Sequence, residues 1–221
     1  MSETKKYELT SETLQYAGHT LHRIKALRNF GTIQAGELGG WIEKEGNLSQ
    51  GGNAWVHDNA KVYGDARVFG DAIVRDYAKV YGEAKVCDNA KVRDNAWVFD
   101  NVWLFDQVEV FDYALVQDEA KVRDNARIFG NVWVRDQAVI GGNAKVCDNA
   151  DYIVFKNFWS SGRYFTWTRS NNKWCVGCFY GTGEELIKKA YEDGDTSGRE
   201  YERVVRYVEG ILVDEKKEKK K

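Results

Sequence analysis

Histidine and cysteine are the side chains of this 221-residue chain that could do chemistry near neutral pH. The histidines are His19, His22 and His57, and an imidazole can serve as a general base because its pKa lies near the working pH. Cys175 and Cys178 form one CxxC pair, which is a zinc-ligand spacing. A structural zinc site usually takes four ligands, and the sequence holds no second pair. We therefore expect neither a metal site nor a cofactor.

Composition bounds the class of partner. The net charge is −2 and the pI about 6.0, so no overall field favours duplex nucleic acid or an anionic membrane. No stretch approaches the roughly 20 apolar residues of a membrane span, and the start MSETKKYELT has no apolar signal region. We expect a cytoplasmic protein whose thiols, including Cys87 and Cys147, stay reduced.

A repeat of six residues runs from position 54 to position 150, through units such as AKVYGD, ARVFGD and AKVRDN. Sixteen aliphatic residues stand six apart from Val56 to Val146, and Ala or Val stands two residues before each. A period of six does not fit an α-helix, but it fits a short strand followed by a bend. Asp, Gly and Asn at the bend tolerate left-handed backbone. Three units then close a triangular coil of 18 residues around the aliphatic side chains, with successive coils about 4.8 Å apart.

These units, for example V-Y-G-D-A-R at residues 62–67, resemble the hexapeptide-repeat family over about 97 residues. The resemblance implies a left-handed parallel β-helix and a homotrimer. The segment from Ala35 to Ala60, AGELGGWIEKEGNLSQGGNAWVHDNA, is similar to the start of uncharacterised bacterial and phage members. The predicted fold class is mainly β, with a small C-terminal α+β domain.

Enzymes of that family set a second expectation. Many are acyltransferases with a histidine base near a loop that interrupts the coils, and others resemble carbonic anhydrases with three zinc-binding histidines. Here the repeat contains only His57, no loop interrupts it, and no histidines stand at coil-related positions. We expect a non-catalytic protein, and a divergent acyltransferase using His57 is the enzymatic alternative.

The 18-residue period sorts the outward side chains into three walls. The first wall carries Lys61, Tyr63, Lys79, Tyr81, Trp97, Phe99, Leu115, Gln117, Trp133 and Arg135. The second wall carries Arg67, Phe69, Lys85, Cys87, Trp103, Phe105, Lys121, Arg123 and Val139. The third wall carries Trp55, His57, Ile73, Arg75, Lys91, Arg93, Glu109, Phe111, Arg127, Phe129 and Lys145. The cations stand mostly beside aromatic residues or Asp, which indicates a solvated, ion-paired surface.

The first wall is the most aromatic, and a contiguous exposed apolar patch indicates contact with another surface. Self-association is the leading interpretation, and the alternatives are a ligand groove and packing against the terminal domain. The predicted oligomer interface consists of Tyr63, Tyr81, Trp97, Phe99, Leu115 and Trp133.

The open ends of such a column need caps. Residues 1–50 are predicted to form a β cap, with a hairpin around Ala17 and Gly18, before the repeat body at 51–150. Residues 151–213 are predicted to form a ββαα domain. Its hairpin turns at Asn171 and Asn172, and capping boxes at Thr182 and Ser197 start its helices. Residues 214–221 form a charged tail with the composition of disorder.

The C-terminal domain is the predicted place of specific function. The segment from Gly181 through Thr182 to Gly183 leads into a helix N-terminus, which favours an anion. Basic side chains could bind phosphate and tryptophans could stack on a base. The candidate ligand-binding residues are Arg163, Trp167, Arg169, Lys173, Trp174, Gly181, Thr182 and Gly183. We therefore expect a small anionic ligand, for which a nucleotide is the candidate. In the alternative, these residues are a helix cap and a small core, and the protein is a structural or protein-binding module.

Overall fold

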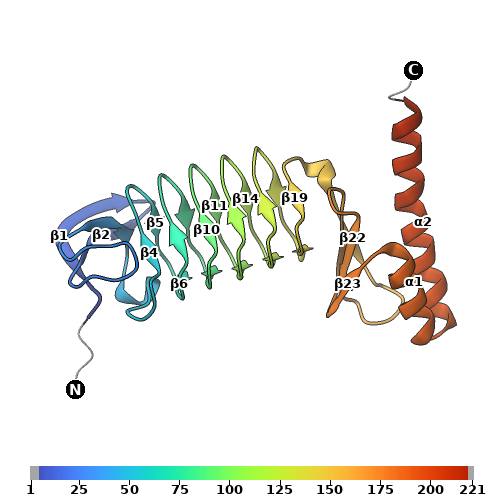
Figure 1. The fold of residues 1–221 in the computed structure, drawn as a ribbon, viewed down its shortest axis with the longest axis horizontal. Coiled ribbons are helices and arrows are strands. Elements are labelled where there is room, and N and C mark those ends of the chain that lie inside the picture. The colour runs from blue at the N-terminus through green and yellow to red at the C-terminus, as the bar shows by residue number, and fades with distance from the viewer. Residues whose placement is uncertain (1–4, 219–221) are drawn as a thin grey trace.

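The computed structural model describes residues 5–218 as a column of coils with a β cap at one end and an α+β domain at the other (Figure 1). The coils contain β4 (Trp55–Val56), β5 (Lys61–Val62), β6 (Arg67–Val68), β7 (Ile73–Val74), β8 (Lys79–Val80), β9 (Lys85–Val86), β10 (Lys91–Val92), β11 (Trp97–Val98), β12 (Trp103–Leu104), β13 (Glu109–Val110), β14 (Leu115–Val116), β15 (Lys121–Val122), β16 (Arg127–Ile128), β17 (Trp133–Val134), β18 (Val139–Ile140) and β19 (Lys145–Val146).

Every third strand of the column pairs in parallel with an offset of 18 residues, as Lys61 with Lys79 and Lys79 with Trp97. Three sheets result, and they are the three predicted walls: β5-β8-β11-β14-β17, β6-β9-β12-β15-β18 and β4-β7-β10-β13-β16-β19. The aliphatic residue of every unit is buried, with at most 1% of its surface exposed. The predicted parallel β-helix with a C-terminal α+β part is confirmed.

The corners between strands explain why Asp recurs in the sequence. The first corner residue of nearly every unit has positive φ, and it is Gly or Asp, as at Gly82 (φ 70°) and Asp94 (φ 58°). Asp in this region is strained relative to Gly. Its carboxylate accepts a hydrogen bond from the corner amide one coil further on. The Asp76 carboxylate thus accepts from Asp94 N at 3.1 Å, and the Asp94 carboxylate accepts from Asp112 N at 3.3 Å. The corner aspartates therefore join successive coils.

The N-terminal cap continues the ladder of the first wall. β3 (Leu38–Ile42) pairs in parallel with β5 and antiparallel with β2 (His19–Ala26), which forms a hairpin with β1 (Tyr7–Tyr16). The short helix η1 (Glu45–Asn47) follows β3. Two buried side chains close the open coil. Lys6 Nζ donates to Ala54 O at 2.8 Å, and Asn47 Nδ2 donates to Gly64 O and Ala66 O at 3.0 and 2.9 Å.

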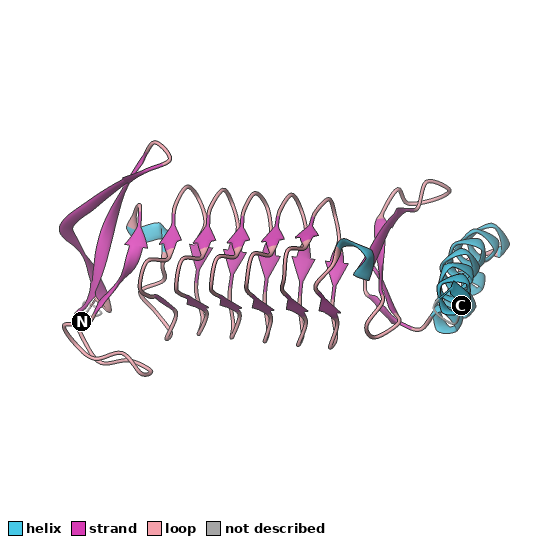
Figure 2. Ribbon diagram, turned by 90° about the horizontal axis from the view of Figure 1, so that it is seen from above, coloured by secondary structure: helices cyan, strands magenta, loops and turns pink. Residues whose placement is uncertain are grey.

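The C-terminal domain begins with η2 (Asn149–Asp151) and contains β20 (Tyr152–Lys156), β21 (Tyr164–Thr168), β22 (Lys173–Val176), β23 (Phe179–Gly181), α1 (Gly183–Glu192) and α2 (Asp195–Glu218). Its four strands form one antiparallel sheet in chain order. The sheet stands between the last coil and the helices (Figure 2). Its aromatic face, with Phe165, Trp167 and Trp174, packs on α1 and α2.

The domain differs from the ββαα prediction in three ways. The second helix begins at Asp195, so Ser197, predicted to cap its start, lies inside its first turn. β20 and β23 add strands on either side of the predicted hairpin. The second helix continues to Glu218, whereas the sequence indicated a disordered tail from residue 214. Arg169 explains the longer helix, because its guanidinium forms a two-pronged ion pair with Glu215 at 2.6 and 3.1 Å. The last three residues of the predicted tail lie outside the described residues.

The last coil is capped by side chains rather than by another parallel strand. Val139 N donates to Thr166 Oγ1 at 2.9 Å, and Lys145 N donates to Ser170 Oγ at 2.7 Å. Trp133 N donates to Asn149 Oδ1 at 2.9 Å. One amide from each of the three walls thus finds an acceptor in the C-terminal domain. Within residues 5–218, neither helix combines the length and apolar character that crossing a membrane requires.

Candidate functional site

The two tryptophans among the predicted ligand-binding residues lie in the core of the C-terminal domain. Trp167 and Trp174 are 1% and 2% exposed, and both pack beneath α1 and α2. The indole N–H of Trp167 donates to Asn172 Oδ1 at 2.9 Å. Their faces are covered by the chain's own side chains, so in this conformation neither ring is presented to solvent.

The helix N-terminus at Gly181 to Gly183 already holds a carboxylate of the chain. Thr182 N donates to Glu185 Oε2 at 2.7 Å, and Glu185 N donates to Thr182 Oγ1 at 3.3 Å. The backbone hydrogen bond from Thr182 lowers the pKa of Glu185 below its ordinary value. The position that an anion would occupy at this helix is therefore filled by Glu185.

The basic candidates are separated along one strand. Arg169 and Lys173 flank the turn that joins β21 to β22, and Arg169 is held there by Glu215 and by Ala150 O, which its Nε approaches at 3.1 Å. Arg163 precedes β21 and so lies at the opposite end of that strand. Arg163 and Arg169 are therefore not brought to one site.

Arg163 instead lines a cavity of about 410 Å³ where the C-terminal sheet meets the second wall. We call this cavity the seam. The C-terminal domain contributes Arg163, Tyr164 and Gly177. The second wall and its corner contribute Trp103, Phe105, Glu119, Lys121, Arg123, Gln137 and Val139. The size lies within the range of small-molecule sites.

The charges lining the seam are mostly positive. Neither Lys121 nor Arg163 has an ion-pair partner within residues 5–218. Arg123 lies 3.5 Å from the Asp124 carboxylate, and Glu119 is the one lining residue with a negative charge. An anion would bring a partner to two cations that the described chain leaves unpaired.

Sequence reasoning missed Lys121, Arg123 and Trp103 as site residues because it interpreted wall cations as an ion-paired surface. One signal was available. At 18-residue spacing the second wall reads Arg67, Lys85, Trp103, Lys121, with no acidic residue at the equivalent positions. The proximity of Arg163 to this row depends on how the terminal domain sits, and no local pattern encodes it.

The predicted oligomer interface is divided by the N-terminal hairpin. Tyr63, Tyr81 and Phe99 stack in a column with ring centroids 4.9 Å apart. The hairpin covers the first of these rings through Tyr16 and His19, at 5.9 and 5.0 Å between centroids. Further along the wall, Trp97 and Trp133 remain 37% and 50% exposed. They line a shallow cavity of about 280 Å³ with Leu115 and Tyr113.

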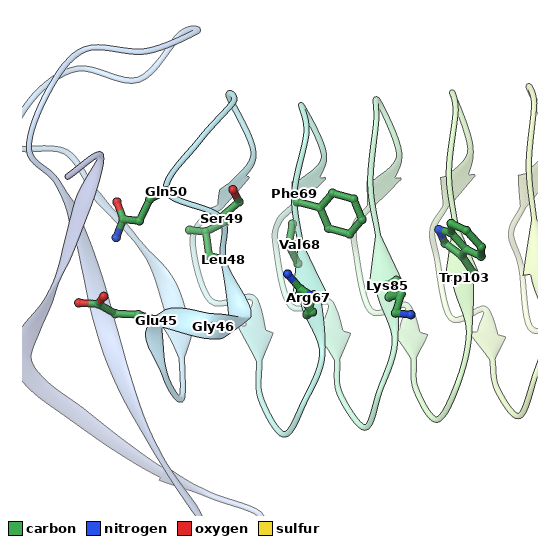
Figure 3. Close-up of a pocket in the computed structure, with 10 residues that line it drawn as sticks. All are labelled: Glu45, Gly46, Leu48, Ser49, Gln50, Arg67, Val68, Phe69, Lys85 and Trp103. Carbon is green, nitrogen blue, oxygen red and sulfur yellow. The ribbon is translucent and has the colours of Figure 1, made fainter. Parts of the chain in front are cut away.

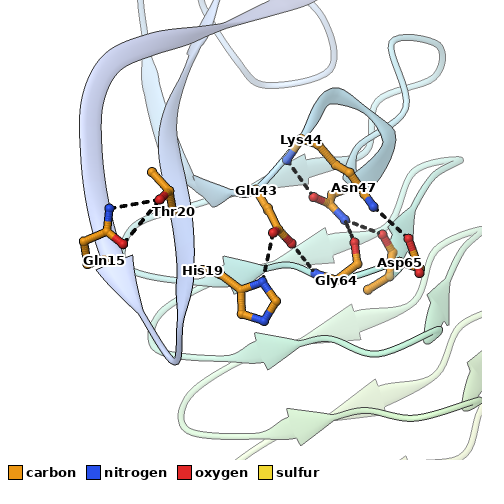
Figure 4. A network of polar contacts seen from close by, with 9 residues as sticks. Gln15, His19, Thr20, Glu43, Lys44, Asn47, Gly64 and Asp65 are labelled. Atoms are coloured by element: carbon orange, nitrogen blue, oxygen red, sulfur yellow. Dashed lines mark hydrogen bonds and ion pairs between the residues drawn. The ribbon is translucent and has the colours of Figure 1, made fainter.

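The histidines and cysteines are distributed over the molecule. His57 is half-buried on the third wall, where burial lowers its pKa, and it lines neither the seam nor the first-wall cavity. His19 Nδ1 contacts Glu43 Oε1 at 2.9 Å in the network that links the hairpin to the first coil (Figure 4). Burial raises the pKa of the Cys87 and Cys175 thiols to about 11, which disfavours their reactive thiolates.

No protein-family model matches the chain, and no curated protein sequence matches it closely enough to identify a relative.

Proposed function

We propose that this protein is a non-catalytic binding protein that holds a small anionic ligand, of the nucleotide class, in the seam. The observation that carries this function is the convergence of Lys121, Arg123 and Arg163 from two separate parts of the chain on one cavity. Charge-assisted hydrogen bonds from Arg and Lys are the usual means of holding a phosphate.

An aromatic side chain at the same cavity favours a nucleotide over a simple anion. Trp103 is 42% exposed, and its ring lies 5.2 Å from that of Phe105. A base that stacks on an exposed ring gains about 1–3 kcal/mol. Tyr164 lines the opposite side of the seam, from the C-terminal sheet. The seam thus offers rings for a base and cations for a phosphate within one cavity.

Binding of mononucleotides tests this function directly. We expect tryptophan fluorescence titrations and thermal shifts to detect nucleoside mono- and triphosphates, since a ligand that binds only the folded state raises its melting temperature. Lys121→Ala and Arg163→Ala should each weaken binding about tenfold. The matched control is Lys91→Ala on the third wall, where Lys91 lies 3.9 Å from Glu109, and it should change affinity less than twofold.

Two results would count against the seam. One is the absence of any shift with the whole panel of nucleotides. The other is equal weakening by the Lys91 control. Turnover of acetyl-CoA that is lost in His57→Ala would instead favour the acyltransferase alternative.

Self-association through the first wall is a second candidate function, favoured by the exposure of Trp97 and Trp133 on one flat sheet. We expect a homotrimer, as the resemblance to hexapeptide-repeat proteins implies. Analytical ultracentrifugation of Trp97→Lys/Trp133→Lys should then give a monomer, whereas Trp103→Lys on the second wall should stay assembled. Unchanged sedimentation of the first variant would contradict this interface.

The repeat pattern and the cysteines also bear on the family and the cellular location of the protein. We infer a left-handed coil of the hexapeptide-repeat class from the hexad pattern, and a cytoplasmic location agrees with four free cysteines. In a phage-type member, a stable multivalent body without a catalytic base could capture a nucleotide signal without cleaving it. Co-purification of a nucleotide with protein expressed in bacteria would support that role.

A further inference from the structure

The second wall carries another cavity, which meets the seam at Trp103. This cavity, of about 720 Å³, lies toward the N-terminal cap between η1 and the wall, and Arg67, Phe69, Lys85 and Trp103 line it (Figure 3). Trp103 also lines the seam. The two cavities therefore adjoin at Trp103 along the second wall, and we call them together the second-wall groove. It runs along the column from the N-terminal cap to the C-terminal sheet.

Unpaired cations form a row along this groove. In the parallel ladder Arg67 pairs with Lys85, Lys85 with Trp103, and Trp103 with Lys121. Neighbouring strands lie about 4.8 Å apart, and like charges directly opposite each other are destabilising. Yet none of the three cations has an ion-pair partner within residues 5–218.

In the third wall, cations at the equivalent positions are paired with a carboxylate of the same wall. There Lys91, Glu109 and Arg127 occupy the equivalent ladder positions, and Glu109 lies 3.9 Å from Lys91 and 3.3 Å from Arg127. In the second wall Trp103 stands where the third wall has its glutamate. An exposed ring thus stands where a carboxylate of the third wall pairs with its neighbouring cations, and the second-wall row has no acidic member at its ladder positions.

Aromatic rings lie beside the cations along the groove. Lys85 Nζ lies 5.9 Å from the Trp103 ring, and half-buried Phe69 and Phe105 follow the same wall. A groove in which cations track a backbone while rings stack on bases is the arrangement that binds single-stranded nucleic acid. Two carboxylates, those of Glu45 and Glu119, are among the residues that line the two cavities. Glu45 is paired with Lys5 at 2.6 Å, and Glu119 lies at the seam.

We propose that the second-wall groove binds a single-stranded oligonucleotide, with phosphates on Arg67, Lys85 and Lys121 and a base on Trp103. This inference rests on the proposed function, because the seam then serves as one end of a longer site. It differs in predicting that affinity grows with the length of the strand, whereas a mononucleotide site gains nothing from additional residues.

Fluorescence anisotropy with labelled oligothymidylates of two to ten nucleotides, and oligouridylates of the same lengths, tests the groove against thymidine and uridine monophosphates. We expect affinity to rise at least tenfold from the monophosphate to the longest strand. The logarithm of the affinity should fall with the logarithm of salt, by about 0.7 for each phosphate contact. The two sugar series show whether the site takes DNA, RNA or both.

Arg67→Ala/Lys85→Ala removes the far half of the row. We expect it to weaken the longest strand about tenfold and to lower the salt slope by about 1.4, which is two contacts. Arg135→Ala/Lys145→Ala removes the same charge from the other two walls and should change strand affinity less than twofold.

The outcomes separate the two proposals. Strands that bind no tighter than the monophosphate overturn the groove while leaving the seam intact. Strands that bind while monophosphates do not would retain the groove and remove the small-ligand function. Equal weakening by the two double variants would mean a general charge effect and would overturn the groove.

Discussion

The two ends of the column are closed in different ways. At the N-terminal end the main-chain ladder continues, since Trp41 N donates to Ala60 O and Ser49 N donates to Val68 O, both at 2.9 Å. At the C-terminal end side chains of a separate sheet accept the last amides, among them the Thr166 hydroxyl. The first cap therefore inherits the register of the coils, whereas the second is a distinct layer laid against them.

This difference changes what each cap adds to the second wall. The N-terminal cap lines a cavity with the wall through residues 45–50, but it contributes no cation there. A distinct layer can overhang the wall and bring in residues from another part of the chain, as Arg163 and Tyr164 are brought to Lys121. The seam is thus a product of side-chain capping.

Both caps rest on the column, so a substitution in its buried interior should have the largest effect on stability. Leu104 is fully buried in the interior, and Leu104→Ala should lower the free energy of unfolding by about 2–5 kcal/mol. Urea denaturation followed by circular dichroism measures the change. Leu115 faces outward from the first wall, so Leu115→Ala should cost no more than about 0.5 kcal/mol in the monomer. Similar losses for the two would contradict the inside-outside assignment.

At the N-terminal end a single added methyl group should disturb the continued ladder. A Cβ at Gly40 would lie 2.7 Å from Ala60 O and 2.8 Å from His57 O, so β3 would have to move away from the first coil. Gly40→Ala should therefore cost about 2–3 kcal/mol of unfolding free energy. A Cβ at Gly46 would meet nothing within 4 Å, and Gly46→Ala is the control with little effect.

At the C-terminal end the loss should be smaller, because one side-chain hydrogen bond is removed rather than a strand displaced. Thr166 is fully buried, and Thr166→Val leaves Val139 N without its acceptor, at a cost of about 1–2 kcal/mol. Hydrogen exchange at the Val139 amide should quicken. Thr166→Ser keeps the hydroxyl and should keep that amide protected; if it exchanges as fast as the valine variant, the hydroxyl is not the cap.

The smallest expected effect is on the pH dependence of the unfolding free energy. A hydrogen bond from His19 holds the pKa of Glu43 below its ordinary value of 4.5. A depressed pKa stabilises the folded state above the unfolded value, and the contribution disappears as pH falls through the lower folded value. Because the pair is partly exposed, we expect only a few tenths of a kcal/mol between pH 6 and pH 3, measured against Glu43→Gln. If the unfolding free energies of the protein and of Glu43→Gln differ by the same amount at pH 6 and at pH 3, the pair contributes nothing to the stability of the cap.

The column could be predicted from sequence because each hexad encodes its own inward residue and its own corner. Val98 is buried and Asp94 adopts positive φ for reasons visible within one unit. Residues 151–218 lack that redundancy. Whether Trp167 faces a ligand or a helix depends on α2, which begins nearly thirty residues later, and the partner of Arg169 is Glu215.

Part of the candidate site could have been predicted as well. The capping box at Thr182 was recognised, but the sequence does not show that Glu185 leaves no room there for a foreign anion. Lys121 and Trp103 were assigned correctly to the second wall. Their meeting with Arg163 could not be foreseen, because it follows from how one sheet rests on the last coil.

The constant offset of 18 residues between paired strands makes the column adjustable in length. Deleting residues 91–108 would remove one whole rung, shorten the molecule by about 4.8 Å and return every corner to the same angular position. The two end domains would keep the same rotational orientation about the axis of the column, because a full turn has been removed. Gene duplication or loss in units of 54 nucleotides could therefore tune the spacing between the two ends without redesigning either of them.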